Sequence, residues 1–361
     1  MNSLFLRAAT RAVASVLLVV ASIDGHAEFK DPLLTPARPT ERLAQAPMTA
    51  VASAGSARLV AAGWRGVIAV SDDAGQSWQQ AKVPVREDLT ALAFPTAKHG
   101  WAVGNEGVLL ETTDGGMNWT KRLDGHIAAQ LMVDKYTRLA ANAPNDKAIA
   151  AALKESENYL VQAPARPFLD VAFENESTGY IVGNYNLLFR TTDGGKTWEP
   201  WFDRTDNPDG YNLYAIGVVG DQVYIVGELG LALRLSRGEQ KFVKLTTPYA
   251  GSFFAAMGAP GGLVVAGLRG NALRSNDAGA TWEKLTFGSS APATFAGAAS
   301  LAGGGLALVT LSGQVFVAAD DKSNFKAIEP KSPMRYSGVV AAGPHKLVLV
   351  GLQGIRTEDY K

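Results

Sequence analysis

Hydrophobic residues in this chain form short runs that are separated by glycine-containing turns, and the same order recurs along the sequence. In one stretch, the apolar run 252–257 leads through Gly261-Gly262 to a second apolar run, 263–266. A Gly-x-x-Gly turn at 267–270 follows, and then two shorter segments, 271–275 and 282–285. Short apolar runs bounded by turn residues predict β-strands. The pattern therefore predicts a repeated unit of four short strands.

An eight-residue motif joins the third and fourth predicted strands of four units. It reads Ser/Thr-x-Asp-x-Gly-x-Ser/Thr/Asn-Trp and is the Asp-box turn. We expect its Asp to accept hydrogen bonds from backbone N–H groups two residues on, and its Gly to adopt a positive φ. The Trp then anchors the next strand in apolar surroundings. We assign structural rather than catalytic roles to the box residues, which are Asp73, Trp78, Asp114, Trp119, Asp193, Trp198, Asp277 and Trp282.

Gly-x-x-Gly pairs between the second and third strands define seven units. Their spacing of about 40 residues, with one doubled interval, matches a four-stranded propeller blade. We therefore predict an all-β, seven-bladed β-propeller with Asp-box turns, whose small-residue first strands surround a narrow channel. Five pairs are complete, Gly183 is followed by Asn186 instead, and one unit keeps a single Gly; the positions are Gly63/Gly66, Gly104/Gly107, Gly183/Asn186, Gly227/Gly230, Gly267/Gly270, Gly313 and Gly351/Gly354.

The doubled interval, residues 125–165, has helical rather than strand periodicity. Leu131, Tyr136 and Leu139 recur at helical spacing, the segment 142–145 breaks the pattern, and Asp146 can cap a second helix. We expect one helical hairpin insertion. Because it connects a fourth strand to the next first strand, we expect it on the same face as the Gly-x-x-Gly turns, where it caps or flanks the mouth of the channel.

The N-terminus has the features of an export signal. Two arginines precede an apolar stretch, and small residues follow up to Ala27. We predict a cleavable signal peptide at 1–27, a mature propeller at 28–361, and a periplasmic or lumenal location. The alternative is that the segment stays uncleaved as a membrane anchor, although its apolar run is short for a membrane span. The last unit runs out after its third strand, so we expect an N-terminal closing segment at 28–45, in which residues 29–38 supply the missing strand. The chain has no cysteine, which excludes disulfides and a lipid-modified cysteine.

Composition narrows the function only modestly. The chain has 34 basic and 34 acidic residues, which argues against a nucleic-acid-binding protein. Its four histidines lack a ligand-like spacing, so we expect no metal and no cofactor. We expect a single-domain monomer.

Several segments resemble the photosystem II assembly and stability factor family. The resemblance rests on 170–173, 179–183 and 190–198, and on the run Gly-Trp-Ala-Val-Gly at 100–104. It implies a non-enzymatic, exported scaffold that assembles or stabilises an envelope complex by docking a membrane-protein subunit. The lipid-attachment cysteine of some relatives is absent from this chain, and the helical insertion is a further departure.

Asp-box propellers also include sialidases and xyloglucan hydrolases, so a glycoside hydrolase is the alternative. A sialidase needs three arginines around one carboxylate, but Arg190, Arg234 and Arg274 fall on the box side, opposite Arg65 and Arg269. Another glycosidase would use a carboxylate pair such as Glu106 and Glu228. We favour the non-enzymatic reading.

The Gly-x-x-Gly turns form one rim of the predicted propeller and carry mixed exposed residues. Aromatic and arginine side chains are typical anchors of protein interfaces. The alternative, that they are ordinary solvated turn residues, stays open. The candidate partner-binding residues are Trp64, Arg65, Asn105, Glu106, Tyr185, Glu228 and Arg269.

Overall fold

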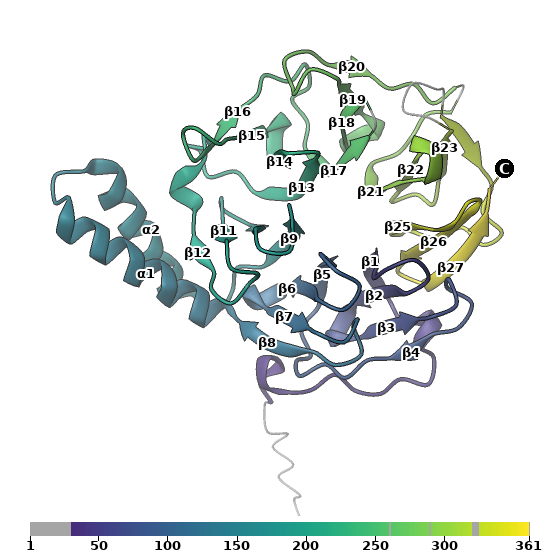
Figure 1. The fold of residues 1–361 in the computed structure, drawn as a ribbon, viewed down its shortest axis with the longest axis horizontal. Coiled ribbons are helices and arrows are strands. Elements are labelled where there is room, and N and C mark those ends of the chain that lie inside the picture. Colours follow the sequence, from purple (N-terminus) through teal and green to yellow (C-terminus); the bar gives the residue numbers. More distant parts are fainter. Residues whose placement is uncertain (1–29, 260, 289, 320–324, 361) are drawn as a thin grey trace, which may run out of the picture. The chain divides into compact units, whose positions relative to one another are not determined.

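The computed structural model describes residues 30–259, 261–288, 290–319 and 325–360. The chain divides into two units, Met1–Lys30 and Asp31–Lys361. The predicted signal peptide, 1–27, lies outside the described residues. Within the described part of the second unit, seven antiparallel sheets form a ring of blades (Figure 1). The all-β, seven-bladed prediction is confirmed.

Six blades have four strands and the seventh has three in the described residues. Strands follow one another in chain order within every blade, from the channel outward. The first four blades are β1 (Met48–Ser53), β2 (Leu59–Gly63), β3 (Ile68–Ser71) and β4 (Gln79–Gln80); β5 (Leu89–Ala93), β6 (Gly100–Gly104), β7 (Leu109–Thr112) and β8 (Thr120–Leu123); β9 (Phe168–Phe173), β10 (Gly179–Gly183), β11 (Leu188–Thr191) and β12 (Glu199–Pro200); and β13 (Leu213–Val219), β14 (Gln222–Gly227), β15 (Ala232–Ser236) and β16 (Lys241–Lys244). The last three are β17 (Phe253–Ala259), β18 (Gly262–Gly267), β19 (Ala272–Ser275) and β20 (Glu283–Lys284); β21 (Phe295–Ser300), β22 (Leu306–Thr310), β23 (Val315–Ala318) and β24 (Lys326–Ile328); and β25 (Tyr336–Gly343), β26 (Lys346–Gly351) and β27 (Gly354–Asp359).

The first strands of all seven blades surround a central channel with a cavity of ≈ 230 Å³. Each of these strands has an irregularity in pairing at its second residue or nearby, where a bulge turns that residue toward the channel. Alanine and glycine are frequent along the channel wall, which allows the strands to approach closely. The predicted channel is confirmed.

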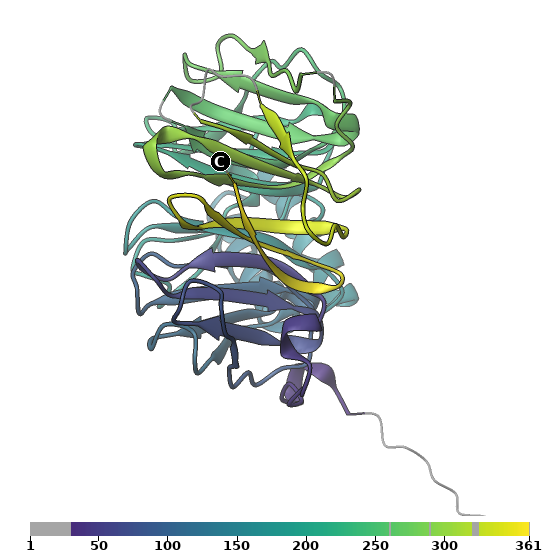
Figure 2. The ribbon, with the colours of Figure 1, turned by 90° about the vertical axis from the view of Figure 1, so that its right-hand side faces the viewer.

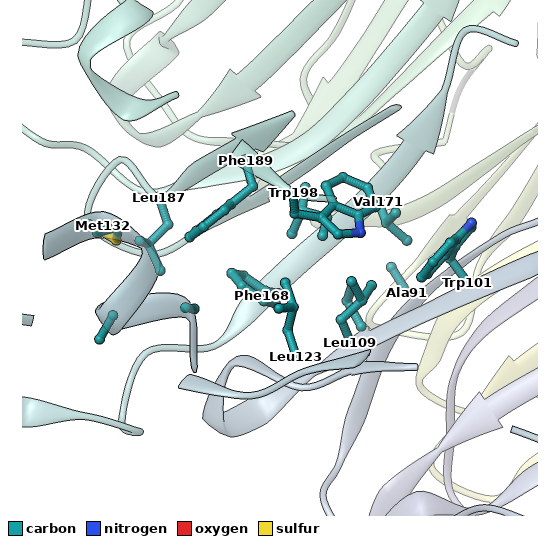
Figure 3. Close-up of a cluster of buried hydrophobic side chains, with 14 of the residues drawn as sticks. Ala91, Trp101, Leu109, Leu123, Met132, Phe168, Val171, Leu187, Phe189 and Trp198 are labelled. Atoms are coloured by element: carbon teal, nitrogen blue, oxygen red, sulfur yellow. The ribbon is translucent and has the colours of Figure 1, made fainter. Parts of the chain in front are cut away.

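The hydrophobic core lies between neighbouring blades. Between blades two and three, Trp101 is fully buried and packs edge-on against Trp198, with ring centroids 5.7 Å apart (Figure 3). Leu109 and Phe168 fill the space beside them. Each sheet thus buries both faces against its neighbours, which is why the second strands are continuously apolar.

All four box turns share the bonds between the Ser or Thr hydroxyl and the Asp and Gly, and the bond from the N–H four residues after the Asp. In the first box, Ser71 Oγ donates to Asp73 Oδ1 (2.8 Å) and accepts from Gly75 N (2.9 Å). Asp73 Oδ1 accepts from the backbone N–H groups of Gln76 and Ser77. The donors therefore lie three and four residues on, not two as the sequence suggested, because the Ser hydroxyl takes the nearer position. The glycine has φ +86°, as predicted.

The turns between second and third strands are called the rim turns, and those of blades one to five share one geometry. The residue before their last position is left-handed, as at Arg65 (φ 56°), Glu106 (φ 55°) and Arg269 (φ 55°). In blades six and seven, the positive φ falls on Gly313 and Gly354 instead. The first glycine of the turn has no room for a side chain, since a Cβ on Gly63 would lie 2.1 Å from the carbonyl oxygen of Pro47. The side view shows strands running between two faces, with the turns gathered on both (Figure 2).

The closure of the ring differs from the prediction. Blade seven has no fourth strand in the described residues, and the described part of the predicted closing strand, 30–38, lies elsewhere, while Phe29 lies outside the described residues. Ala37 N donates to Val83 O, and Arg86 N donates to Pro32 O, so this segment follows the connection between blades one and two. Proline at three positions between 32 and 39 weakens it as a strand. Closure comes from direct packing of blade seven on blade one, including Val348 and Val350, and the end of the N-terminal segment at Leu43 packs against the same cluster.

The predicted helical hairpin is present as α1 (Gly125–Asn142) and α2 (Lys147–Gln162), and Asp146 caps α2 by accepting from Ala148 N and Ile149 N. Its base lies near the rim turn of blade two, where a Cβ on Gly107 would be 2.8 Å from Gly125 Cα. From there the helices project outward, away from the channel (Figure 1). The expectation that the hairpin caps or flanks the mouth of the channel is wrong, because α1 packs along β12, the outer strand of blade three.

The hairpin is anchored by polar and apolar contacts. Lys135 Nζ donates to Pro200 O (2.6 Å) and pairs with Glu199, and Tyr136 Oη donates to Asp203 (2.6 Å). Met132 joins the core between blades two and three. No helix in the described residues is both long and apolar enough to cross a membrane.

Candidate partner-binding face

The rim turns collect most of the exposed large hydrophobic side chains of the described residues. Tyr185 is 60% exposed and Leu229 is 62% exposed. Five of the nine such side chains lie on rim turns, three lie on the hairpin, and one lies on the N-terminal segment; they are Trp64, Tyr185, Leu229, Leu311 and Leu352, then Ile127, Leu160 and Val161, and then Leu34. The box turns contribute none. This asymmetry makes the rim face the candidate for binding a partner.

The backbone of the rim turns is fixed by the next blade. Arg65 N donates to Asp88 Oδ1 (2.7 Å), and Tyr185 N donates to Asn212 Oδ1 (2.7 Å). Arg269 N donates to Thr294 Oγ1 in the same way. These bonds hold the left-handed residue in place, so that its side chain is presented from a rigid backbone.

The largest groove on this face lies between the N-terminal segment and blade one. Its volume is ≈ 700 Å³, and its lining includes Trp64, Arg65, Arg38 and Arg86, together with three prolines. The Arg86 Nε atom is buried without a hydrogen-bond partner in the structure. We call this the rim groove. Sequence reasoning found Trp64 and Arg65 but missed Arg38 and Arg86, which lie in segments far from any repeat signature.

The rim groove has chemistry suited to a partner with carboxylates. Within the described residues, Arg38, Arg65 and Arg86 form no ion pair, and arginine binds carboxylates through two parallel N–H donors. Trp64 adds an aromatic anchor.

The other predicted rim residues are distributed among several blades. Asn105 and Glu106 lie on the turn η4 (Asn105–Gly107) of blade two, and Glu228 lies on the turn η6 (Glu228–Gly230) of blade four. Glu228 accepts from Asn212 N (2.8 Å) and from Tyr214 Oη (3.2 Å). The turn of blade three lies between them, so the geometry does not bring Glu106 and Glu228 together as a catalytic pair.

Acidic groups gather beside blade two. Burial, followed by the neighbouring carboxylates Glu106, Asp88 and Asp31, raises the pKa of Glu87. Asp31 and Glu87 adjoin the groove residues Pro32 and Arg86 in the chain, and Asp88 accepts from Arg65 N, so carboxylates border the arginines of the rim groove.

The arginines considered for a sialidase serve the fold. Arg190 stacks on the Trp201 ring at 4.5 Å, and Arg234 donates to the carbonyl oxygen of Ala278 (3.1 Å). They lie on separate blades and engage protein groups rather than one common pocket. Among the described residues, no cluster of three or more His, Cys, Asp or Glu side chains is arranged to hold a metal ion.

Residues 50–140 and 151–250 match the family model described as "Photosynthesis system II assembly factor YCF48". The chain belongs to this family. The match covers more than half of the chain, and its interruption at 141–150 coincides with the tip of the helical hairpin.

Similar proteins carry related names. The photosystem II assembly protein Ycf48 of Synechococcus sp. (strain JA-2-3B'a(2-13)) is 29% identical over 136 residues, which are 35% of this chain and 40% of the relative. The photosystem II assembly lipoprotein Ycf48 of Synechococcus sp. (strain CC9902) is 24% identical over 278 residues, 63% of this chain and 72% of the relative. The chain thus matches about two fifths of the length of the first relative.

Solved structures show the same fold. A YCF48 bound to a D1 peptide has a TM-score of 0.62 at 15% identity, and the match covers 92% of this chain and 99% of that one. The GH74 enzyme of Niastella koreensis has a TM-score of 0.58 at 13% identity, over 87% of this chain and 52% of that one. Since an enzyme and an assembly factor share the fold, the function must be argued from the site.

Proposed function

We propose that this chain is an exported, non-enzymatic assembly or stability factor that holds a segment of a membrane-protein subunit on its rim face. Membership of the YCF48 family supports the role, and a YCF48 structure with a bound D1 peptide supports a peptide as the occupant. A photosystem II subunit is the partner that these relatives favour.

One observation carries the choice of face. Exposed large hydrophobic side chains gather on the rim turns and the hairpin, whereas the box turns carry none among the described residues. The rim groove adds a Trp and three arginines within one cavity. Aromatic and arginine anchors dominate the energetics of protein interfaces.

Crosslinking tests the choice of face. A photo-reactive residue at position 229, an exposed position on another rim turn, should capture a membrane-protein subunit from the native envelope. Adding Trp64→Ala and Arg269→Ala to that protein should reduce capture at least tenfold at an unchanged melting temperature. The matched control, Thr113→Ala with Asn276→Ala, changes exposed residues of two box turns. Equal loss of capture in the control, or full capture in the rim variant, would reject the rim face.

Two further parts of the proposal have their own tests. Export with cleavage near Ala27 predicts a mature chain that begins at Glu28, which intact-mass measurement of the envelope protein checks. A non-enzymatic role predicts that the purified wild type releases no sugar from a panel of glycans. Hydrolysis of a glycan by the wild type that is lost in Glu106→Gln or Glu228→Gln would support the enzyme alternative instead.

A further inference from the structure

A second groove lies on the outer edge of the ring, between the start of α1 and the box turn of blade three. We call it the hairpin groove; its volume is ≈ 510 Å³. Ile127 and Leu131 from α1 form one wall, and Lys196 and Trp198 from the box turn form the other. It is separate from the rim groove and shares no lining residue with it. A volume of this size is typical of sites that accept a small ligand or a few side chains.

The hairpin groove has an apolar interior. Ile127 is 44% exposed although it lies beside the buried core residues Leu123 and Trp198 (Figure 3 shows the latter two). Of the four box tryptophans, Trp198 alone has an indole N–H without an acceptor in the structure, while Trp119 Nε1 donates to Gly116 O (2.7 Å). The groove thus sets the exposed aliphatic side chain of Ile127 beside the largely buried indole ring of Trp198.

The polar edge of the hairpin groove carries positive charge. Its one lining carboxylate, Glu111, forms an ion pair with Arg122 and also contacts the His99 ring (2.8 Å). Arg122 remains half exposed. Lys196 is exposed and forms no ion pair within the part of the chain that the structure describes, and the nearby carboxylate of Asp193 is engaged by its own box turn.

We propose that the hairpin groove binds an acidic peptide segment of a partner protein, with an aliphatic side chain of that segment inserted between Ile127 and Trp198. Carboxylates flanking the aliphatic side chain would face Lys196 and Arg122. Apolar burial supplies affinity, and the charges select the partner. This site goes beyond the proposed rim function, since it lies on a different part of the molecule and depends on the hairpin.

Fluorescence anisotropy with short labelled peptides tests the proposal on the purified protein. The probe is Ac-Glu-Asp-Leu-Leu-Asp-Glu, with Lys in place of the acids in one control peptide and Ser in place of both Leu in the other. We expect the acidic aliphatic peptide to bind at least tenfold more tightly than either control. Binding should weaken as salt is raised, because the charges lie at a solvent-exposed edge.

Matched variants locate the site. Ile127→Asp and Lys196→Glu should each weaken binding of the acidic peptide at least fivefold, and Lys196→Glu should improve binding of the lysine peptide. The controls Val161→Asp and Lys154→Glu make the same changes at exposed α2 positions outside the groove. Trp64→Ala should have no effect, which separates this site from the rim face.

Three results would overturn the inference. These are equal binding of the acidic and lysine peptides by the wild type, equal binding of the Leu and Ser peptides, and equal losses in the groove variants and their α2 controls. Circular dichroism of each variant checks that the fold is retained. If Ile127→Asp unfolds the protein, the Lys196→Glu variant still tests the proposal. It should bind the acidic peptide more weakly and the lysine peptide more tightly than the wild type does.

Discussion

Ser337 in the last blade donates a hydrogen bond from Oγ to the carbonyl oxygen of Met48 in the first blade (2.8 Å). The same link recurs where the chain is continuous, since Thr90 Oγ1 donates to Phe168 O (2.8 Å) between blades two and three. Both donors sit at the bulge of a first strand. The first and last blades are therefore joined by the same kind of hydrogen bond, from a first-strand hydroxyl to a backbone carbonyl, that joins blades two and three.

Ser337→Ala should lower the free energy of unfolding by about 1 kcal/mol, the usual net value of one hydrogen bond. Hydrogen exchange should quicken in β1 and β25, because the junction between first and last blades has no covalent connection. The control is Thr90→Ser, which keeps the hydroxyl that donates to Phe168 O between blades two and three. Uniformly faster exchange around the ring would mean that this junction is not a local weak point.

The rim turn of blade seven packs on the segment that precedes blade one. Gly354 has φ +97°, and a Cβ there would lie 2.0 Å from the carbonyl oxygen of Ala44. Gly354→Ala should destabilise the protein by roughly 3 kcal/mol, from backbone strain and overpacking together. Gly220→Ala, at φ +58° with no neighbour within 4 Å, should cost only about 1 kcal/mol. Chemical denaturation compares the two, and equal losses would show that the Ala44 contact is unimportant.

Tryptophan substitutions in two box turns should differ in cost. Trp198 is 6% exposed and lies in the core, whereas Trp282 is only partly buried. Trp198→Ala should cost about 3–5 kcal/mol. Trp282→Ala should cost about half of that, because less apolar area is lost. Urea unfolding measures both, and a larger loss at Trp282 would contradict the burial argument.

Asp170 should make stability depend on pH. Burial in the channel wall raises its pKa to about 7, although Val171 N and Ile216 N donate to its carboxylate. The folded state holds the Asp170 proton more tightly than the unfolded state does. Protonation of Asp170 therefore stabilises the folded state fully below about pH 4, and this stabilisation is lost as the pH rises through 7. The melting temperature should fall by a few degrees between pH 5 and pH 8.

Asp170→Asn is the matched variant for that measurement. It removes the titrating proton and should flatten this part of the pH profile, even if its absolute stability is lower because an amide offers one acceptor oxygen instead of two. An unchanged pH slope in Asp170→Asn would assign the effect to another group.

Replacement of 127–163 by a Gly/Ser linker should lower stability by several kcal/mol, because Met132 and Tyr159 belong to the core between blades two and three. A shorter deletion that removes only the outer turns, 139–153, spares both core residues and should have a much smaller effect. Thermal unfolding of the two variants provides the comparison. Similar stability in both would show that the hairpin does not support the blades.

The sequence predicted the local features of the fold because these depend on neighbouring residues. The left-handed Asn186 (φ 61°) and the cap at Asp146 follow from residue type and spacing alone. The direction of the hairpin did not follow, since it is set by contacts such as Tyr136 with Asp203, which lie 67 residues apart. Because the insertion connects a fourth strand to the next first strand, the sequence predicted correctly that its base lies on the face of the rim turns. It did not predict the direction in which the helices run from there.

The candidate site was predictable only in part, for the same reason. Trp64 and Arg65 belong to a repeat turn, and their exposure follows from its position. Arg38 and Arg86 reach the rim groove because the N-terminal segment runs beside the connection between blades one and two, where Ala37 N donates to Val83 O. No periodic pattern marks that pairing, and proline in the segment was the one available sign that it does not form a strand.

The backbone geometry that the rim turns of blades one to five share has a consequence for how this surface can change. Each complete turn presents two variable side chains between two glycines, on a framework fixed by bonds such as that from Arg65 N to Asp88. Replacing those two side chains changes the chemistry of the surface, while the backbone conformation of the turn stays the same. Specificity for a new partner can therefore arise through point substitutions, and the face offers a scaffold on which binders with chosen targets can be selected.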